Sequence, residues 1–209
     1  MLVYLVFAAV GFLSGSVLYC YGLPLLFKNV DVRKDTYDHN PGAYNAIKAT
    51  GPLFGGMCLF LDALKGFLPV FLARTMGADI FNVLFILVLI APVLGHILGI
   101  FVKDGGGKGI AVSFGVMLAL ISVDFCVLVL AVFYAFCTYV VEVFPNSKRS
   151  IICFGGTSLI SLASSFYTGH FVISISLIII TVMVSLKHFE SDDIHLPGRL
   201  DNLFKTNRN

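Results

Sequence analysis

The chain has 209 residues, of which 58% are hydrophobic and 12% are charged, and its mean hydropathy is +0.94. A soluble domain carries about 25% charged residues, so this composition excludes an ordinary soluble protein and indicates an integral membrane protein. The formal net charge of +2 is small and does not indicate a nucleic-acid partner. None of the five cysteines forms a CxxC motif, and no histidine pair has the spacing of metal ligands, so we expect neither a metal nor a cofactor.

Apolar stretches long enough for membrane spans make up most of the chain. A helix needs about 20 apolar residues to cross a bilayer. The stretches lie at about 1–26, 52–73, 80–102, 109–144, 150–166 and 170–186. The first begins at Met1 without a basic segment before it and is longer than the core of a signal peptide, so we expect it to remain as a span. The fourth is too long for one crossing, and a tight turn at Ser122 and Asp124 would divide it.

The distribution of basic residues favours seven spans over six. Twelve of the 14 lysines and arginines face the cytoplasm if the N-terminus lies outside and 109–144 crosses twice. We therefore predict an all-α integral membrane protein with about seven transmembrane helices, the N-terminus out and the C-terminus cytoplasmic. Residues 1–209 would form one polytopic membrane domain that ends in a short cytoplasmic tail at 187–209. The helix near 109–122 would be short for a full span, and therefore tilted, re-entrant or buried in the bundle.

This topology brings three polar stretches to the cytoplasmic boundary, where a shared site would have to be built. They are 27–50, 102–109 and 187–209. In the first, Asn40-Pro41-Gly42 is a strong turn signal, and Asn45 can cap or begin the helix that follows. One interpretation is an ordinary turn between two spans. The other is a loop that aims backbone amides, asparagine side chains and Lys48 at a small polar ligand.

The second polar stretch reads KDGGGKGIA over residues 103–111. Backbone N–H groups in a glycine-rich turn, followed by a helix N-terminus, favour binding of an anion such as phosphate, and Lys108 adds a full positive charge. The stretch is not a Walker A loop, because Val102 stands where that motif needs glycine and Gly109 follows the lysine. His96 precedes the loop and is either a packed histidine or part of a site at the membrane boundary.

The third polar stretch closes the last apolar segment. Lys187 is favoured at a helix C-terminus by the helix dipole and by the positive-inside rule, so its presence needs no function. His188 and Asp193 match H-x-x-x-x-D, a pattern of another acyltransferase superfamily. A pattern of two residues arises often by chance, so it carries little weight.

Two charged residues lie inside an apolar stretch. Asp62 and Lys65 are three residues apart and therefore share one face of a helix. Each charge alone would cost roughly 2.5–3.5 kcal/mol at the bilayer centre, so we expect them either to form a structural ion pair or to face a polar cavity.

Several short motifs of this chain occur in the order and at the spacing of one known family. They are Gly15-Ser16, Asn40-Pro41-Gly42-Ala43 with Asn45, Asp62-x-Leu64-Lys65-Gly66, Gly95-His96, Gly106-Gly107-Lys108-Gly109 with Ala111, and Lys187-His188. In these motifs, over nearly its whole length, the chain resembles the acyl-phosphate glycerol-3-phosphate acyltransferases of bacterial membranes, the PlsY family.

The resemblance implies a seven-helix, multi-pass enzyme of the bacterial cell (inner) membrane with its active site on the cytoplasmic side. It implies transfer of a fatty acyl group from acyl phosphate to the 1-hydroxyl of glycerol 3-phosphate, giving lysophosphatidate, without metal, acyl-CoA or acyl carrier protein. The partners would be the two substrates, membrane lipid and, by coupling, the enzyme that makes acyl phosphate. The catalytic residues would be His96, Lys108 and His188. The substrate- and phosphate-binding residues would be Asp38, Asn40, Gly42, Asn45, Lys48, Gly106, Gly107, Gly109 and Lys187.

The chain also departs from the family pattern, most clearly where Asp38 stands in place of a serine. This carboxylate would oppose binding of a phosphate unless it is paired, so we expect Asp38 to pair with Lys48 or to act as a base with His39. The other departures are His39, Tyr44, Lys48, Gly105, Val112, Lys187 and Ser191. Lysine does not reproduce the bidentate phosphate contact of the arginine that the family has at two of these positions. Two alternatives therefore stay open: the same fold with another acceptor, and a membrane protein without catalytic activity.

Overall fold

The structure is a computed structural model that describes residues 1–34, 36, 38–103 and 105–190. The described residues form nine α-helices, as the sequence predicts for an all-α protein. The helices are α1 (Leu2–Ser16), α2 (Tyr19–Lys28), α3 (Ala43–Thr50), α4 (Pro52–Thr75), α5 (Phe85–Leu98), α6 (Ile110–Leu118), α7 (Cys126–Tyr139), α8 (Asn146–Thr168) and α9 (Phe171–Glu190).

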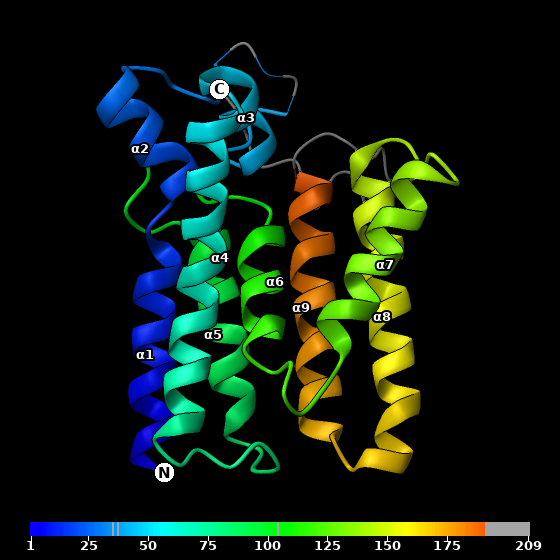
Figure 1. The fold of residues 1–209 in the computed structure, drawn as a ribbon. Coiled ribbons are helices and arrows are strands. Elements are labelled where there is room, and N and C mark those ends of the chain that lie inside the picture. The colour runs from blue at the N-terminus through cyan, green and yellow to red at the C-terminus, as the bar shows by residue number, and fades with distance from the viewer. Residues whose placement is uncertain (35, 37, 104, 191–209) are drawn as a thin grey trace.

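The helices form an elongated bundle with two short helices at one end. The helices α1, α4, α5, α6, α7, α8 and α9 run side by side along one axis, while α2 and α3 lie together at the end opposite Met1 (Figure 1). We call this end, where α9 also finishes, the α3 end. The connections from α4 to α5 and from α8 to α9 lie at the other end (Figure 1). The polar segment between α2 and α3 and the C-terminal end of α9 are therefore brought to one end of the bundle.

Several helices have the length and composition of membrane spans. The helices α4, α8 and α9 are each long and apolar enough to cross a bilayer, and α1 with α2 would be a fourth crossing, bent by 43°. The helices α5 and α7 are apolar but shorter. The sequence prediction of about seven crossings, and of the side on which each terminus lies, therefore stays a prediction.

The long apolar stretch at 109–144 divides as predicted. The short helix α6 ends at Leu118, a series of turns follows, and α7 begins at Cys126. Asp124 stabilises the start of α7, because its Oδ1 accepts a hydrogen bond from the backbone N–H of Cys126 at 2.9 Å. The turn therefore falls where Ser122 and Asp124 predict it.

Glycines allow the short helix α6 to lie directly against α4. A Cβ added to Gly66 would overlap the carbonyl oxygen of Val112, and one added to Gly115 would overlap that of Ala63. Contacts this close between helix backbones need small residues. Of the three alternatives for this segment, tilted, re-entrant or buried, the close packing favours a helix buried in the bundle. It also fixes the position of the N-terminus of α6 relative to α4.

The helices α8 and α9 meet along a polar seam instead. The hydroxyl of Ser174 lies 2.8 Å from that of Ser161 and 2.6 Å from that of Ser165, and Ser158 lies 2.8 Å from Thr181. Hydrogen bonds between helices are a common means of association inside a membrane. The seam positions α9, whose last turn carries Lys187 and His188.

Candidate active site

A cavity of about 500 Å³ opens at the α3 end and gathers residues from most of the predicted motifs. It is bounded by the segment before α3, by α4, by the end of α5, by the start of α6 and by the facing ends of α8 and α9. Its lining includes Asp38, Asn40, Gly42, Asn45, Asp62, His96, Lys108, Gly109, Asn146 and His188, with Leu59, Ala63 and Phe114 as an apolar wall. Polar groups thus meet an apolar wall in one cavity at the end of the bundle.

An ion pair between two distant residues stands in this cavity. The Nζ of Lys108 lies 2.8 Å from Oδ2 of Asp38, and their side chains are 7% and 24% exposed. The other carboxylate oxygen, Oδ1, accepts a hydrogen bond from Nδ2 of Asn45 at 3.0 Å. The same Nδ2 donates to the backbone oxygen of Asn40 at 2.9 Å. The Asn40 turn and the start of α3 are thereby fixed around the Asp38 carboxylate.

These contacts set the charge of Asp38. Burial alone would raise its pKa, but hydrogen bonds from Lys108 and Asn45, together with the lysine charge, outweigh burial and hold the pKa below its ordinary value. The carboxylate is therefore ionised at neutral pH and neutralises Lys108. The predicted partners were wrong: Lys48 is exposed on α3, and the ring of His39 turns to the backbone oxygen of Arg33, 2.9 Å from its Nδ1.

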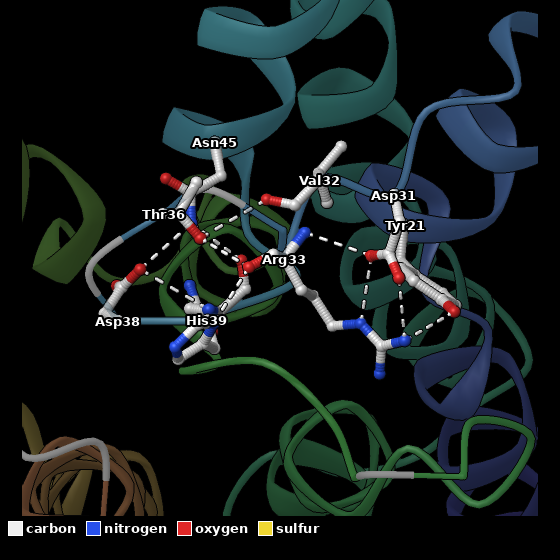
Figure 2. A network of polar contacts seen from close by, with 9 residues as sticks. Tyr21, Asp31, Val32, Arg33, Thr36, Asp38, His39 and Asn45 are labelled. Atoms are coloured by element: carbon white, nitrogen blue, oxygen red, sulfur yellow. Dashed lines mark hydrogen bonds and ion pairs between the residues drawn. The ribbon is translucent and has the colours of Figure 1, made fainter.

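The other end of the same loop is held by Arg33. Its guanidinium binds both carboxylate oxygens of Asp31, at 3.1 and 3.2 Å, donates to the hydroxyl of Tyr21 at 2.8 Å and lies 4.3 Å from the centre of the Tyr21 ring. The hydrogen bonds from Arg33 lower the pKa of Asp31. Figure 2 shows Asp31 and Asp38 on opposite sides of the loop. The arginine contacts fasten the loop to α2, and Asp38 faces the cavity.

The glycine loop differs from the predicted cradle of backbone amides. The N–H groups of Gly106 and Gly107 donate to the backbone oxygens of Ile97 and His96, each at 3.1 Å. The last carbonyls of a helix lack partners within the helix, so these amides are taken up in capping α5. Neither glycine belongs to the cavity lining. Helix N-termini favour anions, and at this end the N-terminus of α6 lines the cavity, through Ile110 and Ala111 beside Lys108.

Glycine is required in this loop for two separate physical reasons. Gly105 and Gly109 have φ of 84° and 82°, a conformation that costs other residues energy. Gly106 and Gly107 are close to α5: a Cβ on Gly106 would overlap the carbonyl oxygen of His96, and one on Gly107 would lie 2.5 Å from Nε2 of the same histidine. The run of glycines is therefore needed to fold the loop tightly back on α5, which brings Lys108 to the cavity.

The two predicted catalytic histidines form part of the inner wall. His96 is 3% exposed and His188 is 1% exposed. Within the described part of the chain, Nδ1 of His96 is buried without a hydrogen-bond partner. Lys187 lies behind the glycine loop, with its Nζ 3.9 Å from the position of a Cβ on Gly105, and is not part of the lining. Asp193, the second residue of the H-x-x-x-x-D pattern, lies outside the described residues.

The charges inside α4 form an ion pair, and Asp62 also belongs to the cavity lining, so for Asp62 both predicted alternatives are found. The Nζ of Lys65 lies 2.7 Å from Oδ1 of Asp62, and each side chain is 2% exposed. The carboxylate also accepts the backbone N–H groups of Tyr19 and Cys20, both at 3.2 Å, while Lys65 donates to the backbone oxygen of Val17. The pair thus caps the two helix ends at the bend between α1 and α2, with each charge at the favourable pole.

Residues 5–193 match the model of the family described as glycerol-3-phosphate acyltransferase. The chain belongs to this family. Two solved structures of PlsY (YgiH), an integral membrane glycerol 3-phosphate acyltransferase, are similar to it. The glycerol 3-phosphate form is 29% identical with a TM-score of 0.72, and the lysophosphatidic acid form is 28% identical with a TM-score of 0.71. Each comparison covers 97% of this chain and 99% of the other.

Curated members of the glycerol-3-phosphate acyltransferase family are similar over a shorter stretch. The protein of Thermotoga petrophila is 48% identical and that of Thermotoga maritima 46% identical, each over 114 residues. This stretch is 54% of the present chain and spans 57% of the length of each relative. Together with the apolar helices, the whole-chain likeness to PlsY places this family member among multi-pass membrane proteins.

Sequence reasoning missed the apolar residues of the lining and one polar residue, Asn146. Asn146 is the first residue of α8, directly after Pro145, and its side chain reaches the cavity. Its Oδ1 accepts a hydrogen bond from Arg149 at 2.6 Å. Proline beside asparagine is a recognisable signal of a helix start, although the basic residues Lys148 and Arg149 are the more conspicuous feature of this segment. Within the described part of this family member, no three His, Cys, Asp or Glu side chains are placed to hold a metal ion.

Proposed function

We propose that the chain transfers a fatty acyl group from acyl phosphate to the 1-hydroxyl of glycerol 3-phosphate, which gives lysophosphatidate and phosphate. The observation that carries the proposal is the cavity at the α3 end, where Lys108, the N-terminus of α6 and a group of asparagines meet an apolar wall. Both substrates carry a phosphate, and the donor also carries a lipid tail. A cavity with a polar part and an apolar wall therefore suits both substrates.

The residues of the cavity divide into three roles. The N-terminus of α6 and Lys108 would hold the donor phosphate and offset the charge that grows on it as it leaves. The wall of Leu59, Ala63 and Phe114 would carry the first part of the acyl chain toward the bilayer. Asn40 and Asn45 would orient the acceptor, and holding the two substrates side by side supplies much of the rate increase. His96 and His188 keep their predicted catalytic role as part of this proposal.

The proposed setting is the bacterial cell membrane, with the α3 end on the cytoplasmic side. Acyl phosphate is a reactive mixed anhydride with a long tail, so delivery along the membrane from the enzyme that makes it would limit its loss to water. Coupling to that enzyme is part of the proposal, as are the two substrates as partners.

The test is a direct measurement of the product. The purified protein, reconstituted in lipid, is given palmitoyl phosphate with and without glycerol 3-phosphate, and lysophosphatidate is quantified. We expect product when both substrates are present, with phosphate released in equal amount. Consumption of palmitoyl phosphate without lysophosphatidate would contradict the proposal and favour another acceptor. The absence of any reaction would favour a protein without catalytic activity.

The alternative of another acceptor rests on a specific observation. Asp38 already neutralises Lys108, so the cavity has less positive charge for a second dianion than its lysine suggests. A neutral polyol or another alcohol would avoid this conflict. An acceptor screen at fixed palmitoyl phosphate separates the two, because each predicts a different ester product.

A further inference from the structure

A second cavity lies toward the end of the bundle opposite the α3 end, and the proposed acyl transfer does not use it. It has a volume of about 500 Å³ and is formed by the last turn of α4, the segment that follows α4, and the turn between α6 and α7. The connection from α4 to α5 lies at the Met1 end of the bundle (Figure 1). The polar residues that line this cavity are Arg74, Thr75, Asp79 and Ser122. We call it the Arg74 cavity.

Arg74 is the basic residue that the predicted topology leaves at the outer membrane boundary, where lysine and arginine are scarce. Its guanidinium donates to the backbone oxygen of Ala119 and, at 2.9 Å, to Oγ of Ser122. The last carbonyls of a helix lack partners within the helix, so the first contact caps the end of α6. A guanidinium has more N–H donors than these two contacts use, and Arg74 therefore keeps donors for a ligand in the cavity.

Ser122 adds a further donor beside the arginine. Its hydroxyl oxygen accepts the hydrogen bond from Arg74, which leaves its own O–H for a ligand. The hydroxyl of Thr75 is already committed, because it donates to the backbone oxygen of Leu72 at 3.0 Å. A guanidinium next to a hydroxyl is a combination that binds the oxygens of a phosphate.

Asp79 brings a negative charge to the same cavity. Its Oδ1 accepts the backbone N–H of Phe81 at 3.0 Å, which fixes the turn after α4, and the residue is exposed. Although Arg74 and Asp79 line one cavity, they do not form an ion pair with each other within the part of the chain that the structure describes. Asp124, a second carboxylate near this end, is buried against His170 at 3.2 Å. The Arg74 cavity thus has room for a ligand between one positive and one negative side chain.

The rest of the lining is apolar and continues along α4. It consists of Phe71, Ala78, Ile80 and Val123. The ring of Phe71 is stacked on that of Phe67, with 5.3 Å between the ring centres, and Phe71 is 42% exposed. Residues four apart lie above one another on a helix. The two rings therefore form an apolar surface that leads from the cavity along the helix toward the middle of the membrane.

We propose that the Arg74 cavity binds a phospholipid whose headgroup carries a phosphate and a primary ammonium group, as in phosphatidylethanolamine. The phosphate binds Arg74 and Ser122, the ammonium group donates to Asp79, and an acyl chain lies along Phe71 and Phe67. A choline headgroup has no N–H to donate to a carboxylate, and an anionic glycerol headgroup brings no positive charge to it. Charge complementarity therefore selects the ammonium lipid.

The test measures lipid binding directly, without any substrate of the acyl transfer. The purified full-length protein in detergent is titrated with phosphatidylethanolamine, phosphatidylcholine or phosphatidylglycerol of the same acyl chains, and bound lipid is counted by native mass spectrometry. Unfolding is followed in parallel with a thiol-reactive dye, because all five cysteines are buried. A lipid that binds the folded protein raises the melting temperature.

Three variants and one control separate the parts of the site. Arg74→Gln keeps an amide N–H for Ala119 but removes the charge. Asp79→Asn keeps the acceptor for the N–H of Phe81, and Asp79→Lys reverses the charge. Glu142→Gln is the matched control, since it removes an exposed carboxylate between α7 and α8 that does not line the cavity.

We expect the wild type to bind phosphatidylethanolamine about tenfold more tightly than the other two lipids, since a hydrogen bond between charged groups has this effect. Asp79→Asn should bind phosphatidylethanolamine and phosphatidylcholine equally, and Asp79→Lys should prefer phosphatidylglycerol. Arg74→Gln should weaken binding of all three lipids about tenfold. Glu142→Gln should keep the wild-type order of affinities.

Equal binding of the three lipids by the wild type would overturn the proposal, as would a preference that both Asp79 variants retain. A wild-type preference for phosphatidylglycerol would also overturn it, because the cavity would then be a site for anionic lipid. If Arg74→Gln does not fold, the two variants of the exposed Asp79 decide. Failure of the proposed acyl transfer would leave these results unchanged, because they are obtained without acyl phosphate or glycerol 3-phosphate.

Discussion

Two pairs of lysine and aspartate in this molecule have similar geometry and different surroundings. Asp62 and Lys65 stand three residues apart in one helix, 2.7 Å from each other and 2% exposed. Asp38 and Lys108 are separated by 70 residues, lie 2.8 Å apart, and are 24% and 7% exposed. The first pair is almost fully buried and satisfies backbone groups at a helix bend, and only its Asp62 reaches the cavity lining. Both residues of the second pair line the cavity, where Asp38 is partly exposed. Contact distance therefore does not distinguish a buried pair that holds the fold from a pair at a cavity, but the surroundings do.

The sharpest way to test this contrast is to remove the lysine of the cavity pair. Lys108→Ala should lower acyl transfer by about 10³-fold, because the leaving phosphate loses the charge that stabilises it, while the unfolding temperature changes little. The rate of lysophosphatidate formation and the thiol-dye melting curve measure the two effects. Lys103→Ala is the control, as Lys103 is exposed on the same loop and does not line the cavity. Equal activity of both variants would contradict the assigned role.

Removing the aspartate of the buried pair should instead lower the stability of the protein. Asp62→Asn leaves Lys65 without a counter-charge in the bundle, and we expect a loss of about 3–5 kcal/mol in the free energy of unfolding. Replacing both residues, as Asp62→Asn with Lys65→Met, should recover part of this loss, since no uncompensated charge remains. Melting in lipid mimic checks both. A single variant as stable as the wild type would show that the pair does not hold the bend.

The glycine loop that carries Lys108 offers a smaller, geometric test. Gly106→Ala would place a methyl group against the carbonyl oxygen of His96, so the loop would have to move and Lys108 with it. We expect activity to fall by roughly tenfold or more, in line with the sensitivity of catalysis to small displacements. Gly56→Ala in α4 is the matched control, because a Cβ there meets nothing within 4 Å. Activity of the two variants should differ clearly, and similar activity would refute the packing argument.

The smallest expected effect is that of pH on stability. The pKa of Asp38 is lowered in the folded protein, so its contribution to stability is present above the unfolded-state pKa of about 3.9 and is lost as pH falls through the folded-state pKa. Stability from this pair should thus be constant at neutral pH and decline in strong acid. Melting curves of the wild type and Asp38→Asn should converge there, and a difference that grows toward acid would contradict the assigned sign.

The features that the sequence predicted well depend on local chemistry. The turn at Ser122 and Asp124 was expected because one apolar stretch was too long and had polar residues at its middle. Asp124 does accept a hydrogen bond from the backbone N–H of Cys126, the first residue of the next helix. The alternative of an ion pair between Asp62 and Lys65 follows from their spacing on a helix. The family motifs likewise are short runs of residues, and the match over residues 5–193 confirms the family that they indicated.

The features that the sequence predicted poorly depend on which distant segments meet. The partner of Asp38 was sought within ten residues, at Lys48 or His39, but it is Lys108, 70 residues away. The amides of Gly106 and Gly107 were expected to face an anion, but the end of α5 lies beside them and takes their hydrogen bonds. Asn146 lies at a helix start that its proline signals, but the sequence does not indicate that this helix start meets the segment before α3 and the end of α9.

The sequence by itself determined that this is an all-helical membrane protein and which residue types carry its motifs, because hydropathy, helix periodicity and turn chemistry act over a few residues. The tertiary structure alone decided which charges meet in the cavity and which N–H groups of the glycine loop are used to cap α5. An ion pair or a hydrogen bond requires atoms within about 3 Å, and the packing of α4, α5 and α6 through their glycines sets those distances.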